Sequence, residues 1–424
     1  DALTKLRTQN AECRIEDIHQ DEDVLDTWFS SWLWPISVFD GFKNPDGADI
    51  RYYYPTNDLV TAPEILFFWV ARMIIAGYEY RGEKPFTNVY LTGIVRDKQG
   101  RKMSKSLGNS PDPIELIEKH GADGVRVGML LCSPAGNDLP FDESLCEQGR
   151  NFSNKIWNAF RLVKMWETSS AEQSQANKIT VQWFDARFNE QLAIINELYS
   201  RHRISDVLMT TYKLVWDDFC AWYLEMIKPE FMDGKSLPID KITYDATIIF
   251  FERLLKILHP FMPFITEELW HLVADRKKGD CIIVSRWPEA QPVTEPSKKI
   301  MADFSVAAQL ITGIRDYRKQ KNVSPKEQIG SLVISSNNGS GMPGDDFQRV
   351  IRKLGNIGTI TDSGIKPVNS YQFVVGNLSC FVPLPDNADP GVERERILQE
   401  LNYTKGFLRS VQSKLANDRF VANA

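Results

Sequence analysis

The residues best suited to chemistry lie in one short run, from Gly100 to Asn109, which reads GRKMSKSLGN. Between Thr92 and Ser106 five basic residues accompany a single acid, so this segment carries +4 in a chain whose net charge is -6. Ammonium groups and backbone N–H donors on a glycine-flanked loop can follow a polyphosphate, and glycine allows the loop to move. The alternative is a solvated turn, as most charged runs are. The basic residues are Arg96, Lys98, Arg101, Lys102 and Lys105.

The order of residues in this run excludes the commonest phosphate-binding loop. A Walker loop places its glycines before the lysine, as Gly-x-x-x-x-Gly-Lys-Ser/Thr after a strand. Here the lysines come first and Gly108 comes last. Residues 102–106 instead match the KMSKS signature letter for letter, and in this the chain resembles the class I aminoacyl-tRNA synthetases.

The resemblance implies a mechanism for the run. In that family the signature loop is mobile, and it stabilises the pyrophosphate that leaves when an amino acid carboxylate attacks the α-phosphate of ATP, which carries Mg²⁺. Positioning and charge stabilisation do most of the work in such transfers, so no nucleophilic side chain is required. We expect Lys105 to contact the ATP phosphates and Lys102 to support it as the second catalytic lysine. Met103, Ser104 and Ser106 complete the expected ATP-binding loop.

Further stretches extend the resemblance to the valine-specific members of the class. They are residues 23–31 (DVLDTWFSS), 65–73 (ILFFWVARM), 92–97 (TGIVRD) and 218–225 (DFCAWYLE). The resemblance places the valine side chain against Trp28, Ile65 and Trp69, and rigid apolar walls suit a small branched aliphatic. Such a pocket rejects isoleucine by bulk but rejects isosteric threonine only about a hundredfold, which is why an editing domain belongs to the family. The alternative is that all three side chains are plain core.

Composition bounds the class of protein. With 424 residues, 43% hydrophobic and 25% charged, the chain is typical of a globular protein with two to four domains. The acidic balance excludes a uniformly basic nucleic-acid-coating protein, so any RNA contact must be local. The longest apolar run, residues 65–75, contains Arg72 and is too short to cross a bilayer. We expect a cytoplasmic monomer with no membrane partner.

Cysteine spacing predicts neither a disulfide framework nor a zinc site, and we expect no protein-bound metal. The six cysteines are widely scattered without a C-x-x-C pair, which suits a reducing compartment. They are Cys13, Cys132, Cys146, Cys220, Cys281 and Cys380.

The elements before the signature run must position it. A strand is predicted at residues 52–60, and Thr61 with Glu64 three residues later predicts a capped helix start with Pro63 in its first turn. Apolar residues then recur every fourth position on a stripe that faces the interior or a pocket. That stripe is Ile65, Trp69 and Met73.

The elements after the stripe complete the pattern. Residues 88–93 form a β-rich run that leads into the basic loop, and Asp112-Pro113 begins a helix that Gly121 ends. The order helix, strand, loop, helix is that of the second half of an open α/β sheet, which binds ligands beyond the carboxyl ends of its strands. The expected fold is therefore the second half of a Rossmann-type domain.

From about residue 147 the chain changes to long helical periods, which predicts a helical bundle. Helices are expected from Arg150 onward and at residues 184–199, 204–227 and 250–273. Most bundle aromatics should be core, although stacking on unpaired RNA bases is the alternative: Trp183, Phe188, Trp216, Phe219, Trp222 and Tyr223. Polar residues on the first bundle helix could contact tRNA phosphates or bases: Arg150, Asn154, Lys155 and Asn158.

The last third of the sequence changes character twice. Residues 296–384 predict a small α/β appendage with helices at 304–319 and 347–354 and strands at 329–334 and 371–382. Apolar residues then alternate spacings of four and three, as in a coiled-coil seam: Ile397, Leu401, Thr404, Leu408, Val411 and Leu415. Because this stripe has no second helix to pair with, we expect the coiled coil to be partial.

By analogy with the family, the chain divides into six segments. They are the exit of an inserted editing domain (1–22), half of the Rossmann catalytic domain (23–108), a stem-contact connector (109–150), an anticodon-binding helical bundle (151–290), a small α/β domain (291–385) and the start of a coiled coil (386–424). The implied partners are ATP, valine and tRNA(Val).

One departure from the family pattern matters. The second family signature, His-x-Gly-His, is absent, because none of the five histidines stands two residues from another around a glycine. Together with the first residue, Asp1, this suggests a C-terminal piece of the enzyme, which we expect to have little activity alone. An isoleucyl or leucyl synthetase piece and a non-catalytic tRNA-binding module are the alternatives.

Overall fold

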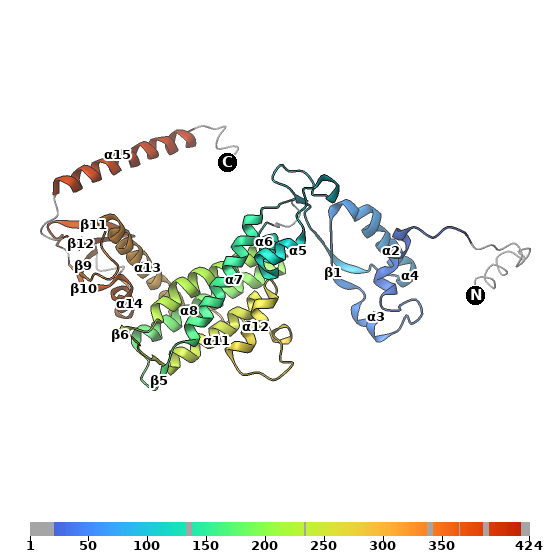
Figure 1. The fold of residues 1–424 in the computed structure, drawn as a ribbon, viewed down its shortest axis with the longest axis horizontal. Helices are drawn as coiled ribbons and strands as arrows, with labels where there is room; N and C mark the ends of the chain where they lie inside the picture. Colours follow the sequence, from blue (N-terminus) through green and yellow to red (C-terminus); the bar gives the residue numbers. More distant parts are fainter. Residues whose placement is uncertain are drawn as a thin grey trace, which may run out of the picture. The chain divides into compact units, whose positions relative to one another are not determined.

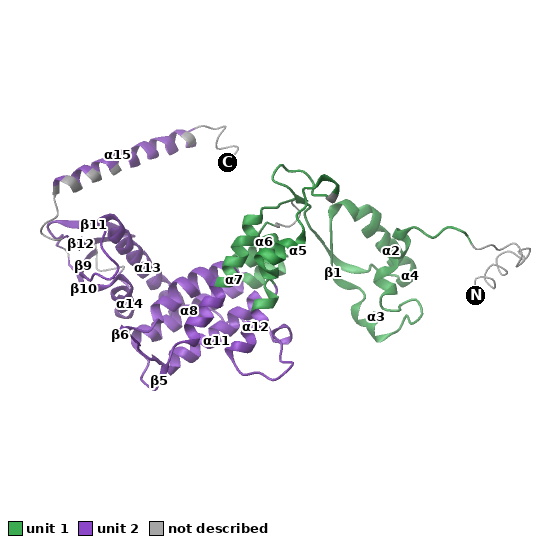
Figure 2. Cartoon of the chain, in the orientation of Figure 1, with its two compact units in different colours: residues 1–154, 195–210, 261–265 green, residues 155–194, 211–260, 266–424 purple. Residues whose placement is uncertain are grey.

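The computed structural model describes residues 21–132, 138–232, 235–336, 342–363, 365–384 and 390–416 (Figure 1). The side chains of residues 105, 390, 392, 393, 396, 397, 400 and 414 lie outside this description. The chain forms two compact units: residues 1–154, 195–210 and 261–265, and residues 155–194, 211–260 and 266–424 (Figure 2). The expected exit of an editing domain lies almost wholly outside the described residues, and the six-segment layout stays a prediction.

The first unit contains a parallel β–α–β arrangement. Strand β1 (Thr56–Thr61) pairs with β2 (Phe86–Leu91). Because parallel neighbours need a crossover, the intervening segment is helical, with η2 (Pro63–Ile65), η3 (Leu66–Val70) and α4 (Ala71–Arg81). Helix α2 (Thr27–Ser37) packs against η3 and α4. The strand predicted at residues 52–60 is wrong in its first half, where α3 (Ala48–Tyr53) is helical.

The predicted capped helix start at Thr61 is wrong. Thr61 is the last residue of β1, where it pairs with Leu91, and the helical segment begins one residue later than predicted. Its hydroxyl is buried and has no hydrogen-bond partner among the described residues. The N-cap of η2 is Ala62, and the helix opens as one 3₁₀ turn, widens to a π-helix and becomes α-helical only at Ala71. Of the predicted stripe, Met73 is fully buried and the other two residues are half-buried.

The prediction for the next helix is confirmed. The Asp112 carboxylate accepts a hydrogen bond from the Ile114 N–H at 2.7 Å, and α5 (Pro113–His120) follows it. Gly121, with φ of 76°, ends α5 and precedes α6 (Ala122–Leu131). Short strands β3 (Val95–Arg96) and β4 (Leu139–Pro140) pair in parallel.

The helical region runs from α7 to α12 and differs from the prediction at its ends. It comprises α7 (Glu143–Lys164), α8 (Gln175–Ser200), α9 (Ile204–Lys213), the π-helix η5 (Leu214–Tyr223), α10 (Leu224–Ile227), α11 (Lys241–Leu258) and α12 (Pro263–Val273). Helix α7 begins at Glu143, upstream of the predicted Arg150. The helix predicted at 250–273 is two helices, because Pro260 and Pro263 interrupt its backbone hydrogen bonds.

The core of the second unit is aromatic. Phe184 is fully buried, and its ring contacts those of Trp183, Phe188, Phe219, Tyr223 and Phe250. The Tyr223 hydroxyl lies 2.8 Å from the Thr247 hydroxyl, which satisfies both groups in an otherwise apolar interior. The prediction that most bundle aromatics are core is thereby confirmed, although Trp216 and Trp222 are only half-buried.

The small α/β part follows α13 (Glu295–Lys321). Its sheet has the order β10-β9-β12-β11, built from β9 (Ile329–Ser336), β10 (Ile357–Asp362), β11 (Ser370–Val375) and β12 (Leu378–Pro383), with α14 (Asp345–Gly355) connecting β9 to its parallel neighbour β10. The predicted strand at 371–382 is a hairpin that turns at Gly376, where φ is 55°. Strand β10 was not predicted.

The remaining elements are short, except for the last helix. They are η4 (Lys105–Leu107), β5 (Thr168–Ser169), β6 (Phe231–Met232), β7 (Lys235–Ser236), β8 (Ile239–Asp240) and η6 (Ile282–Val284). Helix α15 (Pro390–Leu415) confirms the predicted terminal helix, and Leu401 and Leu408 on its stripe are exposed. Ile397 lies among the undescribed side chains, and the coiled coil stays a prediction.

Candidate functional site

Residues 95–109 form a β-hairpin followed by a tight turn, which we call the signature hairpin. The Asp97 N–H donates to the Arg101 carbonyl at 2.9 Å, and the Met103 N–H donates to the Val95 carbonyl at 3.1 Å. The chain reverses through Gly100, whose φ of 76° favours glycine. The segment predicted as a loop therefore has a regular base.

One carboxylate organises this hairpin. Asp97 accepts hydrogen bonds from the backbone N–H groups of Gln99 and Arg101 at 3.0 and 2.9 Å and from the Asn109 side chain at 3.0 Å. The Arg101 guanidinium adds an ion pair at 2.8 Å. The hydrogen bond from the Asn109 side-chain amide, together with those from Arg101 and Gln99, lowers the pKa of Asp97 to about 2. Asp97 therefore stays charged at neutral pH and joins the two ends of the hairpin.

The two signature serines hold the turn beyond the hairpin. The Ser104 and Ser106 hydroxyls lie 3.1 Å apart, and the Leu107 N–H donates to the Ser104 hydroxyl at 3.3 Å. The Ser104 N–H donates to the Asn109 side-chain carbonyl at 2.9 Å. These bonds satisfy donors of a one-turn 3₁₀ helix that starts at Lys105.

The underside of the hairpin is apolar. The Met103 side chain packs with Val95 against a buried cluster formed by Leu116, Phe141 and Cys146. Its half-buried side chain therefore anchors the loop in this conformation, and the role of Met103 in ATP binding stays a prediction.

Salt bridges attach the hairpin to the segment before α7. Arg96 pairs with Asp138, and Lys98 pairs with Asp142 at 3.4 Å. Both carboxylates have their pKa lowered, Asp138 chiefly by the Arg96 hydrogen bond and Asp142 chiefly by the Ser144 N–H. Of the five basic residues of this segment, Arg96 and Lys98 are thus paired with these two carboxylates, and Arg101 is paired with Asp97.

Lys102 projects from the hairpin towards the crossover helix. Its ammonium lies 3.4 Å from the Glu64 carboxylate, and both side chains are more than half exposed. Glu64 directly precedes Ile65 of the predicted valine pocket, so the signature hairpin and the start of the crossover lie side by side. The Lys105 side chain is outside the described residues.

The predicted valine-pocket residues lie on α2, η2 and η3. The Trp69 indole N–H donates to the Ser31 carbonyl of α2 at 3.2 Å, and its ring stacks on Trp34 with centroids 6.5 Å apart. The Trp28 ring lies 6.4 Å from that of Phe68, the neighbour of Trp69. All three predicted residues, Ile65 included, are half-buried, and Trp69 packs against the buried cluster of Val70, Met73 and Phe86.

The four predicted tRNA-contact residues all lie on α7. Arg150, Asn154 and Asn158 are exposed and four residues apart, which puts them on one stripe. The Lys155 ammonium is 5.3 Å from the centroid of the Trp216 ring. Lys155 therefore already has a partner within the second unit.

Several site residues escaped the sequence reasoning, namely Asp97, Asn109, Glu64 and Asp138. The sequence could have indicated Asp97, because it is the single acid in a basic segment and a carboxylate among cations attracts hydrogen bonds and ion pairs from them. Glu64 and Asp138 act across 38 and 42 residues of sequence, and no local pattern reports such distances.

Two findings concern ions and membranes. Within the described ranges, no group of three or more His, Cys, Asp or Glu side chains could hold a metal ion. No helix in the described part of the chain has the length and apolarity needed to span a bilayer.

Two family models match separate parts of this chain. Residues 1–142 match the family model "tRNA synthetases class I (I, L, M and V)", and residues 181–334 match "Anticodon-binding domain of tRNA ligase". Among solved structures, a LeuRS–tRNA–LeuAMS complex of Agrobacterium radiobacter covers 76% of this chain and 36% of that chain at 18% identity. Its TM-score of 0.48 is too low to support a fold assignment.

Curated relatives align along the whole chain. A valine–tRNA ligase of Christiangramia forsetii is 56% identical over 100% of this chain and 47% of that protein. One from Parabacteroides distasonis is 50% identical with the same coverage, and one from Chlorobaculum tepidum is 35% identical over 96% of this chain. The chain thus spans about half the length of the relatives it matches. With both family models and these relatives in agreement, the chain belongs to the class I tRNA synthetases.

Proposed function

We propose that the protein containing this chain is a valine–tRNA ligase. It would join valine to ATP as valyl-adenylate, with loss of pyrophosphate, and then transfer the valyl group to tRNA(Val) with release of AMP. The observation that carries this proposal is the 56% identity to a valine–tRNA ligase over the full chain. The exposed cationic hairpin beside Glu64 and Ile65 supports it at the level of the site.

Lys102 and Lys105 are the proposed catalytic lysines. When the valine carboxylate oxygen attacks the α-phosphorus, the bond to the bridging oxygen breaks and negative charge grows on the pyrophosphate. Ammonium groups placed there stabilise that charge. The Lys102–Glu64 pair is a surface ion pair, which contributes about 0–1 kcal/mol, so Lys102 can exchange Glu64 for phosphate at little cost.

The base of the hairpin is fixed, which suits a change of partner at Lys102. Asp97 and Met103 fix the lower part through hydrogen bonds and apolar packing, while Lys102 stays exposed. Mg²⁺ would arrive with the ATP phosphates and add positive charge at the same place.

Trp28, Ile65 and Trp69 are the proposed walls of the valine pocket. The bond from Trp69 to the Ser31 carbonyl fixes one ring, and a fixed ring excludes a bulkier side chain better than a free one. Arg150, Asn154, Lys155 and Asn158 of α7 are proposed to contact tRNA, with an affinity that falls as salt rises.

The test is valine-dependent exchange of pyrophosphate into ATP, using the complete natural protein that contains this chain. Lys102→Ala and Lys105→Ala should each lower the exchange rate about a hundredfold or more. Lys98→Ala is the matched control, because it removes an equal charge from the same hairpin but from a lysine that pairs with Asp142 and not with Glu64 beside the proposed valine pocket. An equal loss in all three variants would count against the assigned roles.

Amino acid dependence separates the alternatives. Exchange with isoleucine or leucine but not valine would identify another class I ligase, and no exchange with any amino acid would favour a tRNA-binding module. Trp69→Ala should raise the KM for valine much more than the KM for ATP. Equal increases would argue against the pocket.

A further inference from the structure

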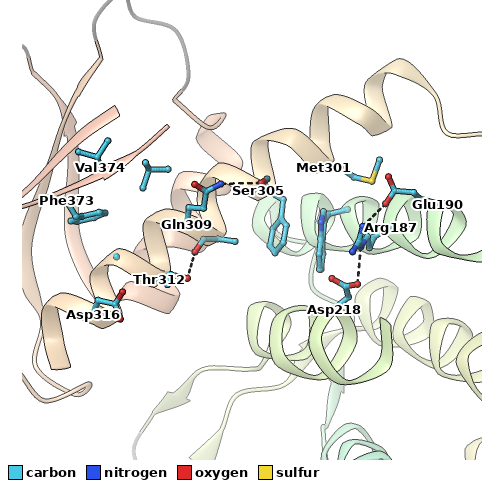
Figure 3. A pocket seen from close by; sticks show the side chains of 15 residues that line it. Arg187, Glu190, Asp218, Met301, Ser305, Gln309, Thr312, Asp316, Phe373 and Val374 are labelled. Carbon is cyan, nitrogen blue, oxygen red and sulfur yellow. Dashed lines mark hydrogen bonds and ion pairs between the residues drawn. The ribbon is translucent and has the colours of Figure 1, made fainter. Parts of the chain in front are cut away.

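Helix α13 carries two cavities of opposite charge on different faces, both within the second unit. The first, which we call the acidic cavity, has a volume of about 640 Å³ and lies among α8, η5, α13 and β11. Figure 3 shows Arg187 bonded to both Asp218 and Glu190, at 3.0 and 2.7 Å. With Asp316 the cavity is lined by three carboxylates and one guanidinium, so it repels anions.

The second cavity, which we call the basic pocket, has a volume of about 740 Å³. Its charged lining residues are three cations, Arg315, Arg318 and Lys319, and the rest of its lining is uncharged: Asn322, Val323, Ser324, Pro325 and Leu354. Arg315 and Lys319 are one helical turn apart, and Asp316 of the acidic cavity is rotated from Arg315 by about 100° on the same helix.

The charge of this pocket is not neutralised by a bonded carboxylate. Arg318 is 7% exposed and donates to the backbone carbonyls of Ser324, Gly355 and Asn356, at 2.6, 2.9 and 3.3 Å. These acceptors carry no formal charge, and Glu327 acts on Arg318 only electrostatically. Arg315 and Lys319 are exposed, and neither forms an ion pair with any residue the structure describes.

An aromatic ring borders one of these cations, Arg315. The Arg315 guanidinium lies 5.4 Å from the centroid of the Trp222 ring, which is itself half-buried against Phe304. Surfaces that bind single-stranded nucleic acid combine cations with aromatic rings, and Arg315 and Trp222 provide one such pair. The negative end of the α13 dipole opposes anion binding here, but its half charge is outweighed by three full positive charges.

We propose that the basic pocket binds backbone phosphates of an RNA strand, with Arg315 and Lys319 as the contacting groups and Arg318 as a buried source of positive potential. This inference rests on the proposed function, in which the RNA is tRNA. A free phosphate ion has the same chemistry as the backbone group, so the experiment must separate the two sources.

The test compares tRNA binding by the complete protein and by an Arg315→Glu/Lys319→Glu variant over a range of salt. The variant should bind tRNA ten- to a hundredfold more weakly at low salt, and its log–log salt slope should be smaller by about 2. Pyrophosphate exchange without tRNA should not change, because the pocket takes no part in adenylation. Arg315→Lys/Lys319→Arg should restore binding, since both side chains bind phosphate as cations.

Two controls make the result decisive. Lys298→Glu/Lys299→Glu changes the charge equally at the other end of α13, about 25 Å away, and Asp316→Asn alters the acidic cavity. The inference would be overturned if the Lys298/Lys299 variant lost as much affinity for tRNA as the pocket variant. It would also be overturned if the pocket variant lost no affinity for tRNA. A pocket variant that loses binding of inorganic phosphate but keeps its affinity for tRNA would overturn it as well. If the wild-type protein shows no valine-dependent exchange, the proposed function fails instead.

Discussion

The signature hairpin and the aromatic core of the bundle are stabilised in opposite ways. In the hairpin a single carboxylate, Asp97, collects hydrogen bonds from both ends, while Lys102 above it stays exposed. In the core the fully buried ring of Phe184 contacts five other rings. A few hydrogen bonds to one carboxylate can fix the base of a hairpin while an exposed side chain such as Lys102 remains able to exchange one ion-pair partner for another. Dense apolar packing allows the side chains one arrangement only.

The core should show the largest effect on stability. Phe184→Ala should lower the free energy of unfolding by about 3–5 kcal/mol, because it removes a fully buried ring and leaves a cavity among its neighbours. Urea unfolding followed by circular dichroism measures this. The exposed Phe231 is the matched control, and Phe231→Ala should cost less than 1 kcal/mol. Equal losses would mean that the ring cluster is not the stabilising core.

In the hairpin, a substitution should lower activity much more than stability. Asp97→Asn removes the charge that gathers the hairpin, so valine-dependent pyrophosphate exchange should fall about a hundredfold through misplacement of the lysines, with little change in Tm. Asp142→Asn, which removes only the partner of Lys98, should have a much smaller effect on exchange. A large drop in Tm with normal exchange would contradict the role assigned to Asp97.

The pKa of Asp97 adds a pH dependence to this prediction. Since the folded value of about 2 is below the ordinary value of 3.8, the bonds of Asp97 stabilise the hairpin fully above pH 3.8 and are lost as pH falls towards 2. Hairpin amide protection from hydrogen exchange should therefore stay constant between pH 5 and 8 after correction for the intrinsic rate. In Asn109→Ala, which lacks the largest contribution to the shift, the pKa of folded Asp97 should rise, so the loss should be smaller and should be complete at higher pH.

A smaller effect is expected where α13 meets the sheet. A Cβ atom at Gly313 would lie 2.3–2.4 Å from atoms of the Phe373 ring, so Gly313→Ala should cost about 1–3 kcal/mol of stability. Adding Phe373→Ala should relieve most of the clash, and the double-mutant cycle measures that coupling. Gly330→Ala is the control, because no atom lies within 4 Å of its added Cβ.

The smallest effect is expected at the helix behind the hairpin. Asp112→Ala removes the cap of α5 and should cost about 1 kcal/mol, whereas Asp112→Asn should retain most of the stability. Because Leu116 of α5 packs in the cluster that anchors Met103, exchange activity should fall slightly as well. Chemical denaturation of both variants checks the difference, and equal stability of the two would rule out a capping role.

Local signals predicted the parts of this fold that local physics controls. The Asp112 cap and the Gly121 helix end were predicted correctly, since each depends on neighbours within a few residues, whereas the strand predicted at 88–93 is β2 at Phe86–Leu91. The capped start at Thr61 failed because pairing with Leu91, thirty residues away, holds Thr61 in a strand. In the same way the KMSKS letters identified the hairpin, while its bonds to Glu64 and Asp138 required the tertiary fold.

The π-helical stretch η3 has a consequence for how this helix tolerates insertions and deletions. A π turn holds one more residue than an α turn, so removing one residue between Leu66 and Val70 would restore regular α spacing without breaking the helix. Such a shortened chain would keep its apolar composition, yet it would swing the indole of Trp69 away from the Ser31 carbonyl. In this stretch the count of residues, as well as their identity, determines which ring faces α2.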